Sequence, residues 1–176
     1  MIRCKSVSFA KLFMYVNIIA TMPSCSPGPY IKIDSAFGPG IKFSEYGDSF
    51  SWAPVDKKDT GDSRADNPQL HDLVKTTVEE QFQVKGYRKV SADTPDFWID
   101  YRIAAKQKTD MGSHGRIQNY DEGSLVLDVI DPGTHKLIWR AVARTELDNS
   151  MPPPVRKERI QTAVKRMLEN LPTVAE

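Results

Sequence analysis

Strict alternation between apolar and polar residues in three segments constrains the fold of this chain more than any other feature. Residues 125–129 and 137–143 alternate in this way, and the Asp-Pro-Gly-Thr sequence at 131–134 between them is typical of a tight turn. Residues 96–105 alternate too, with Phe97, Ile99, Tyr101 and Ile103 on one side. Because successive side chains of a strand point to opposite faces, each segment is predicted to be a half-buried strand, and 125–143 a β-hairpin.

Two other segments have apolar residues at helical spacing. In the first, Asn67 can cap the N-terminus, Pro68 suits the first helical position, and Gly86 suits a left-handed C-terminal cap. The second follows Pro152-Pro153-Pro154 and is expected to end at Pro172. The two apolar stripes predict helices packed on a core; they comprise Leu70, Leu73, Val74, Val78 and Phe82, then Ile160, Ala163, Val164, Met167, Leu168 and Leu171.

The remaining segments complete the predicted order of elements. Residues 30–37 alternate and indicate a strand, and a second β segment is expected over Ile41–Trp52. Asp56–Asp66 is predicted to be an exposed loop and Lys106–Glu122 a long mobile hairpin loop. The order β-β-α-β-β-β-α predicts an α+β fold, with an antiparallel sheet of four to five strands and two helices packed on one face.

The N-terminus has the layout of a secretory signal. Residues 1–11 contain three bases and no acid, and an apolar run follows over residues 12–22. This run is about half the ~20 residues that a membrane-spanning helix needs. Cys25 follows this run directly after Ser24 and resembles the acylated cysteine of bacterial lipoproteins. We therefore expect a signal peptide at 1–24, a lipidated Cys25 and tether at 25–30, and one α+β domain at 31–176. Ordinary cleavage to a soluble product and a retained anchor are the alternatives.

Charge and cysteine content agree with an exported, anchored protein. Without the first 24 residues, 21 bases remain against 23 acids, a net charge of −2, which disfavours nucleic acid as a partner. Cys4 lies in the predicted signal, so Cys25 would be the single cysteine of the mature chain. Ser26 follows Cys25, and the resemblance to bacterial lipoproteins implies that a residue other than Asp at this position directs the protein to the outer membrane, facing the periplasm, with the acyl chains as the membrane contact. A soluble periplasmic protein is the alternative.

Residues that could support catalysis or metal binding form no recognised motif. His71, His114 and His135 lack ligand spacing, and the Asp-rich stretch 56–66 departs from a calcium loop at Lys58 and Thr60. No cofactor or metal is predicted. Asp96, Asp100 and Asp128 lie on or beside strands and, with His114, define the alternative hypothesis of a hydrolase-like enzyme; solvent-facing or arginine-paired carboxylates are the simpler interpretation.

A possible binding face is formed by Trp98, Arg102, Arg140 and Arg144, which alternation places on the exposed side of the sheet. Aromatic and arginine side chains are enriched where protein partners bind. Cation–π and ion-pair cover over the sheet is the competing interpretation.

Several short patterns occur together in a fixed order. They are Phe43, Phe50-Ser51-Trp52-Ala53-Pro54, Val84-Lys85-Gly86-Tyr87, Pro95-Asp96-Phe97, Gly123-Ser124-Leu125 through Val129-Ile130-Asp131, Leu137-Ile138-Trp139-Arg140, and a closing helix with Leu171-Pro172. Over roughly residues 34–172 the chain resembles the bacterial lipoprotein family known as domain of unknown function 4136. The resemblance implies a lipid-anchored α+β domain of the cell envelope and brings no catalytic residue with it.

These observations lead to a non-enzymatic envelope lipoprotein that binds a protein, peptidoglycan or lipid partner through its sheet face or long loops. A structural subunit of an envelope complex is a further hypothesis, besides the hydrolase.

Overall fold

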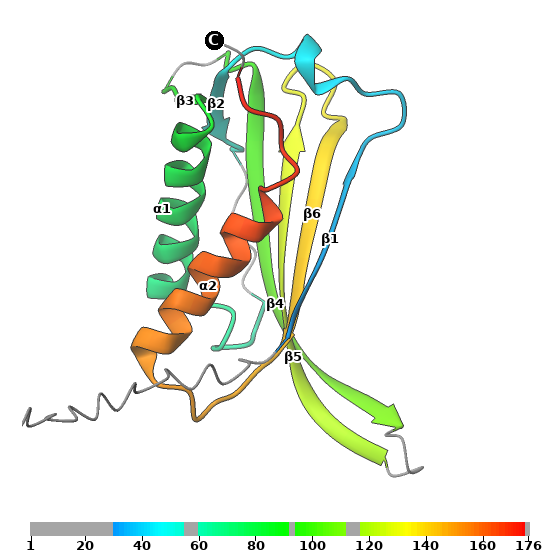
Figure 1. Ribbon diagram of the computed structural model, residues 1–176, viewed down its shortest axis with the longest axis vertical. Helices are drawn as coiled ribbons and strands as arrows, with labels where there is room; N and C mark the ends of the chain where they lie inside the picture. Colours follow the sequence, from blue (N-terminus) through cyan, green and yellow to red (C-terminus); the bar gives the residue numbers. More distant parts are fainter. Residues whose placement is uncertain (1–29, 55–59, 92–93, 112–116, 175–176) are drawn as a thin grey trace, which may run out of the picture.

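The structure is a computed structural model that describes residues 30–54, 60–91, 94–111 and 117–174. The predicted signal peptide, Cys25 and His114 lie outside the described residues. One sheet and two helices make up the fold (Figure 1). The strand order across the sheet is β1-β6-β5-β4-β2-β3.

Four long strands form an antiparallel meander with β1 at its edge. These are β1 (Ile31–Phe37), β4 (Phe97–Met111), β5 (Ile117–Ile130) and β6 (Leu137–Glu146). Asp131 closes the β5–β6 turn, because its carboxylate accepts the backbone N–H groups of Gly133 and Thr134. The predicted hairpin is therefore confirmed.

The sheet has six strands and is mixed, so the prediction of a four- to five-stranded antiparallel sheet is wrong in both respects. β2 (Ser49–Trp52) pairs in parallel with β4 on one side and with β3 (Arg88–Lys89) on the other. Helix α1 (Pro68–Val84) lies between β2 and β4 in the chain and supplies the crossover that parallel neighbours require. β3 escaped prediction because two residues show no periodicity. The region 41–52 also contains a short 3-10 helix, Phe43–Glu45, before β2.

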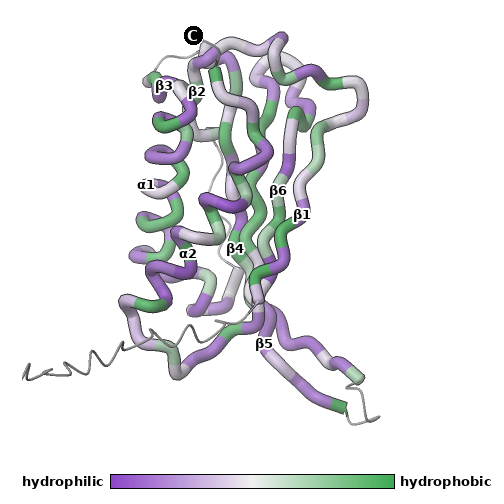
Figure 2. Tube along the Cα trace, in the orientation of Figure 1, coloured by the Kyte–Doolittle hydropathy of each residue, from purple (hydrophilic) through white to green (hydrophobic). Residues whose placement is uncertain are grey.

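The segment Lys106–Glu122 is largely strand, so the prediction of a long mobile hairpin loop there is wrong. β4 and β5 pair without interruption from Lys106↔Glu122 to Met111↔Ile117. This ribbon, hereafter the arm (residues 106–111 and 117–122), extends beyond the helices and is mostly hydrophilic (Figures 1 and 2). A polar sequence can form such a ribbon because cross-strand hydrogen bonds, and not burial, define it; apolar periodicity could not reveal it.

Both helices pack on one face of the sheet, as predicted (Figure 1). They enclose an aromatic cluster in which Phe82 of α1 lies 5.1 Å from Phe50 and 5.4 Å from Tyr87, between ring centroids. Side chains of the inner sheet face complete the core, among them Ile99, Leu127 and Trp139. No helix in the described part of the chain is long and apolar enough to cross a membrane.

The helix ends follow the predicted capping residues at α1 and partly at α2. The Asn67 side chain accepts the N–H groups of Gln69 and Leu70, and Gly86 has a φ of 90° directly after the C-cap. α2 (Pro153–Met167) begins within the proline run but ends before Leu171. Leu171 is nevertheless buried, so the apolar stripe continues into the core after the helix has ended.

Candidate functional sites on the open sheet face and under the helices

The sheet face opposite the helices, hereafter the open face, holds all four residues of the predicted binding face. Trp98, Arg102, Arg140 and Arg144 alternate along β4 and β6 with residues buried in the core, such as Ile99 and Trp139. Their side chains therefore point away from the helices. Trp98 also lies edge-on to His135 of the β5–β6 turn, with centroids 5.3 Å apart.

A carboxylate held by two arginines lies at the centre of the open face. Asp128 of β5 accepts from Arg102 at 2.6 Å and from Arg140 at 2.6 and 2.8 Å. The Asp128 side chain is 5% exposed, whereas those of Arg102 and Arg140 are 58% and 44% exposed. The hydrogen bond to Asp128 raises the pKa of Arg140. The guanidinium groups thus cover the carboxylate and remain partly available to a partner.

The predicted acid–base group is not assembled in a cavity. Asp100 pairs across the strands with Asp128, and burial raises the pKa of Asp100. Asp96 instead accepts from the backbone N–H and hydroxyl of Ser49. His114 lies outside the described residues. Neither of the two cavities that we describe is lined by any of these three aspartates.

The other histidines occupy polar contacts. His71 Nδ1 lies 2.8 Å from the hydroxyl of Tyr101 on the inner face, and the His71 side chain is half-buried. His135 is exposed. Among the described residues there is no cluster of three or more His, Cys, Asp or Glu side chains that could hold a metal ion.

A second candidate site is a groove of about 700 Å³ between the inner sheet face and the first halves of α1 and α2, hereafter the groove. Its volume lies within the range of ~300–1,000 Å³ that is usual for small-molecule sites. The apolar lining comes from α1, α2, β4 and β5 and includes Leu70, Leu73, Ile103, Leu125, Ile160 and Ala163. A smaller cavity of about 660 Å³ is lined by Phe43, Tyr87 and the C-terminal segment.

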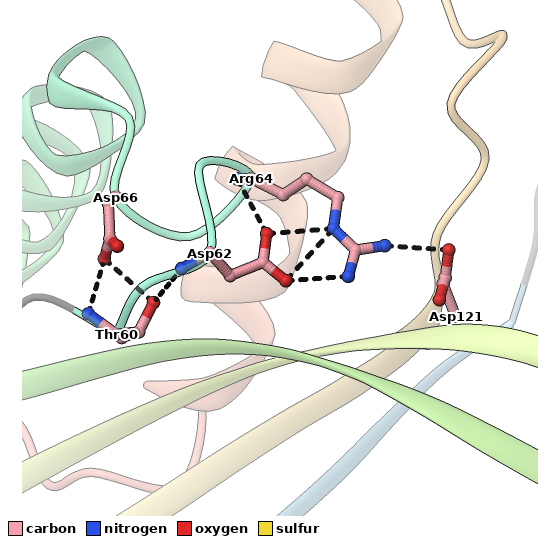
Figure 3. Close-up of polar contacts among 5 residues, drawn as sticks. All are labelled: Thr60, Asp62, Arg64, Asp66 and Asp121. Carbon is pink, nitrogen blue, oxygen red and sulfur yellow. Dashed lines mark hydrogen bonds and ion pairs between the residues drawn. The ribbon is translucent and has the colours of Figure 1, made fainter.

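The loop before α1 forms one wall of the groove, and Figure 3 shows how its polar residues hold it. Arg64 binds Asp62 at 2.7 Å and Asp121 of the arm at 2.7 Å. Asp66 accepts from the backbone and hydroxyl of Thr60. The hydrogen bond with Arg64 lowers the pKa of Asp62 to about 2. Within the Asp-rich stretch 56–66, Asp62 therefore positions Arg64, and Asp66 closes the loop.

The mouth of the groove is basic on the side of α2. Arg156, Lys157 and Arg159 line it, together with Asp148 of the preceding loop. Arg159 donates to the Thr145 hydroxyl and to the Glu146 carbonyl. Arg156 donates to the Met151 carbonyl, and within the described residues neither Arg156 nor Lys157 forms an ion pair with a carboxylate. The mouth therefore has two exposed cations above an apolar interior.

The sequence of this chain matches a known protein family over most of its length. The family described as domain of unknown function (DUF4136) matches residues 33–173. The chain belongs to this family. The comparison with curated proteins finds no match.

Two solved structures share the fold of this DUF4136 chain. A PDZ domain protein from Parabacteroides distasonis matches with a TM-score of 0.57 and 14% identity, over 84% of this chain and 37% of that one. A PelC dodecamer from Paraburkholderia phytofirmans matches with a TM-score of 0.52 and 11% identity, over 83% of this chain and 100% of that one. The chain thus spans only about a third of the first structure, and at these identities the likeness extends to the fold alone.

The open face could be predicted from the sequence, but the groove could not. The four residues of the open face belong to strands whose alternation is visible in the sequence. The groove is lined from segments as distant as Ile31, Arg64, Leu125 and Lys157, each of which looks like an ordinary core or surface residue by itself. Only the packing of the two helices against the sheet brings them together.

Proposed function

We propose that this chain is a non-enzymatic lipoprotein of the bacterial envelope, anchored through acyl chains on Cys25 in the outer membrane, that binds an envelope protein through its open face. The observation that carries the proposal is the grouping of Trp98, Arg102, Arg140 and Arg144 on a sheet face that no helix of the described residues covers. The sequence features of residues 1–25 support the anchor.

The chemistry of the open face suits a protein partner. Arg102, Arg140 and Arg144 keep between 40% and 58% of their side chains exposed while their ion pairs with Asp128 and Asp34 fix their positions. Guanidinium groups that are held in place lose less conformational entropy when they bind a carboxylate or a carbonyl. Trp98 adds apolar area with one polar atom, a combination typical of binding hot spots.

The anchor is tested by the intact mass of the mature chain extracted from membranes, compared with a Cys25→Ser variant. A chain that starts at Cys25 and has the mass of a diacylglyceryl group and one further acyl chain supports the proposal. A chain cut elsewhere and without added mass refutes the anchor and favours a soluble periplasmic protein.

The open face is tested by a photo-crosslinking amino acid placed at position 102 or, as a control, at Glu80, which is exposed on α1. We expect one defined adduct at position 102 and none at position 80. Arg144→Ala should weaken that adduct because Arg144 belongs to the open face, and the fold should survive because the ion pair of Arg144 with Asp34 is exposed. The same adducts at both positions would contradict binding through this face.

A second candidate function is that of a subunit in an oligomer, and the arm favours it. The arm extends away from the body, and Met111 and Ile117 at its end are 73% and 71% exposed. One structure of the same fold is that of a PelC dodecamer. Native mass spectrometry of the chain with and without the arm tests this candidate; a monomer in both cases rejects it.

A further inference from the structure

We infer that the groove binds a single-chain anionic amphiphile of the fatty-acid type, with the acyl chain inside and the headgroup at Arg156 and Lys157. This site is separate from the open face, because the groove is lined by the inner side of the sheet. It goes beyond the proposed function and does not depend on a protein partner.

The interior of the groove selects an apolar chain. Leu70 and Leu73 of α1 face Ile160 and Ala163 of α2 across it, and Ile103 and Leu125 of the sheet form its floor. An alkyl chain placed there would remove this apolar surface from water, at ~25 cal/mol for each Å² buried. A strongly polar ligand such as a sugar would instead lose its hydrogen bonds to water in an interior that offers few partners.

The mouth selects a negative headgroup. Arg156 and Lys157 are adjacent in the first turns of α2, both are exposed, and both line the groove. Arg64 and Arg159 line it as well, but Asp62 and Asp121 already bind Arg64, and the Thr145 hydroxyl and Glu146 carbonyl already accept from Arg159. Asp148 is the one acidic residue of the lining. The charge available to a ligand is therefore positive and lies on α2.

The position of the groove suits a ligand from a membrane. Ile31 lines the groove, and Cys25 precedes it by six residues, which span at most roughly 20 Å. If Cys25 is acylated, the groove lies within that distance of the bilayer surface. This step rests on the proposed function. Fatty acids and lysolipids partition to that surface.

The test measures binding of laurate to the full chain with Cys25→Ser, which removes the acyl chains and permits work without detergent. Displacement of a fluorescent dansyl fatty acid should give saturable binding of laurate below its micelle concentration. Lys157→Glu should weaken laurate binding about fivefold or more, because it replaces an attraction by a repulsion at the headgroup. Dodecanol, which has the same chain length and no charge, should change far less.

Matched variants on the same helix separate the site from general effects. Lys165→Glu makes the same charge change at an exposed position that does not line the groove, and it should leave laurate binding unchanged. Ala163→Trp should fill the groove and abolish binding, whereas Thr162→Trp on the exposed side should not. Circular dichroism checks that each variant folds.

Three outcomes would overturn the inference. They are the absence of saturable laurate binding, an equal effect of Lys157→Glu and Lys165→Glu, and undiminished binding in a folded Ala163→Trp variant. Failure of the anchor would be visible in the mass of the mature chain and not in this assay, so the two proposals fail separately.

Discussion

The carboxylate of Asp128 and its two arginines should respond very differently according to which partner is removed. Asp128→Asn keeps the shape of the side chain and removes its charge. Arg102→Met together with Arg140→Met keeps two long side chains over Asp128 and removes both of its cations. Since Asp128 is 5% exposed and the arginines are 58% and 44% exposed, the two perturbations leave different groups without a partner.

The magnitudes follow from this difference in exposure. In Asp128→Asn the arginine heads return to water, so the free energy of unfolding should fall by only ~1–2 kcal/mol. In the double methionine variant two apolar side chains replace the guanidinium groups over the carboxylate, which loses three charge-assisted hydrogen bonds. Breaking a buried pair in this way costs ~3 kcal/mol or more.

Urea denaturation at pH 7, followed by far-ultraviolet circular dichroism, measures both free energies of unfolding. Each arginine should also be replaced singly, because the two share one carboxylate and their effects should not add. If the double methionine variant is no less stable than Asp128→Asn, then Asp128 is well hydrated in the folded chain and the description of the open face is wrong.

Three further predictions concern other parts of the molecule. Asn67→Ala should destabilise the chain by ~1 kcal/mol in urea denaturation, because two N–H groups of α1 lose their acceptor. Burial raises the pKa of Asp100, so the ionised carboxylate destabilises the folded chain at neutral pH. The Asp100→Asn variant should therefore be more stable than the original chain at pH 7, by up to ~1 kcal/mol, and this difference should vanish as the pH falls below about 4. A difference in stability that persists below that pH would contradict burial of the charge as the cause. Replacing residues 109–119 by Asn-Gly between Lys108 and Tyr120 should change the free energy of unfolding by less than ~1 kcal/mol, since this part of the arm is mostly exposed; a larger loss would show that the arm supports the body.

The tight hairpin and α1 could be predicted from the sequence because their signals are local. The turn at 131–134, the alternation on either side of it and the Asn67 cap all lie within a few residues of the structure that they specify. The mixed character of the sheet could not be predicted in this way. β2 and β4 are brought together by the crossover through α1, and β3 is only two residues long.

The candidate sites, too, were partly predictable from local sequence patterns and partly decided by tertiary structure. Alternation alone placed Trp98, Arg102, Arg140 and Arg144 on one face, but that Asp128 lies between two of them depended on the register of β4, β5 and β6. The arm was hidden because cross-strand hydrogen bonds leave no apolar pattern in a polar sequence.

By itself, the sequence determined the secondary structure that local patterns encode, the family, and which side of each long strand is buried. The tertiary structure alone decided the order of the strands, the partner of each charged side chain, and the existence of a groove between two helices and a sheet. The physical reason is one of range: caps, turns and alternation act within a few residues of the chain, whereas a groove is defined by side chains more than a hundred residues apart, such as Ile31 and Lys157.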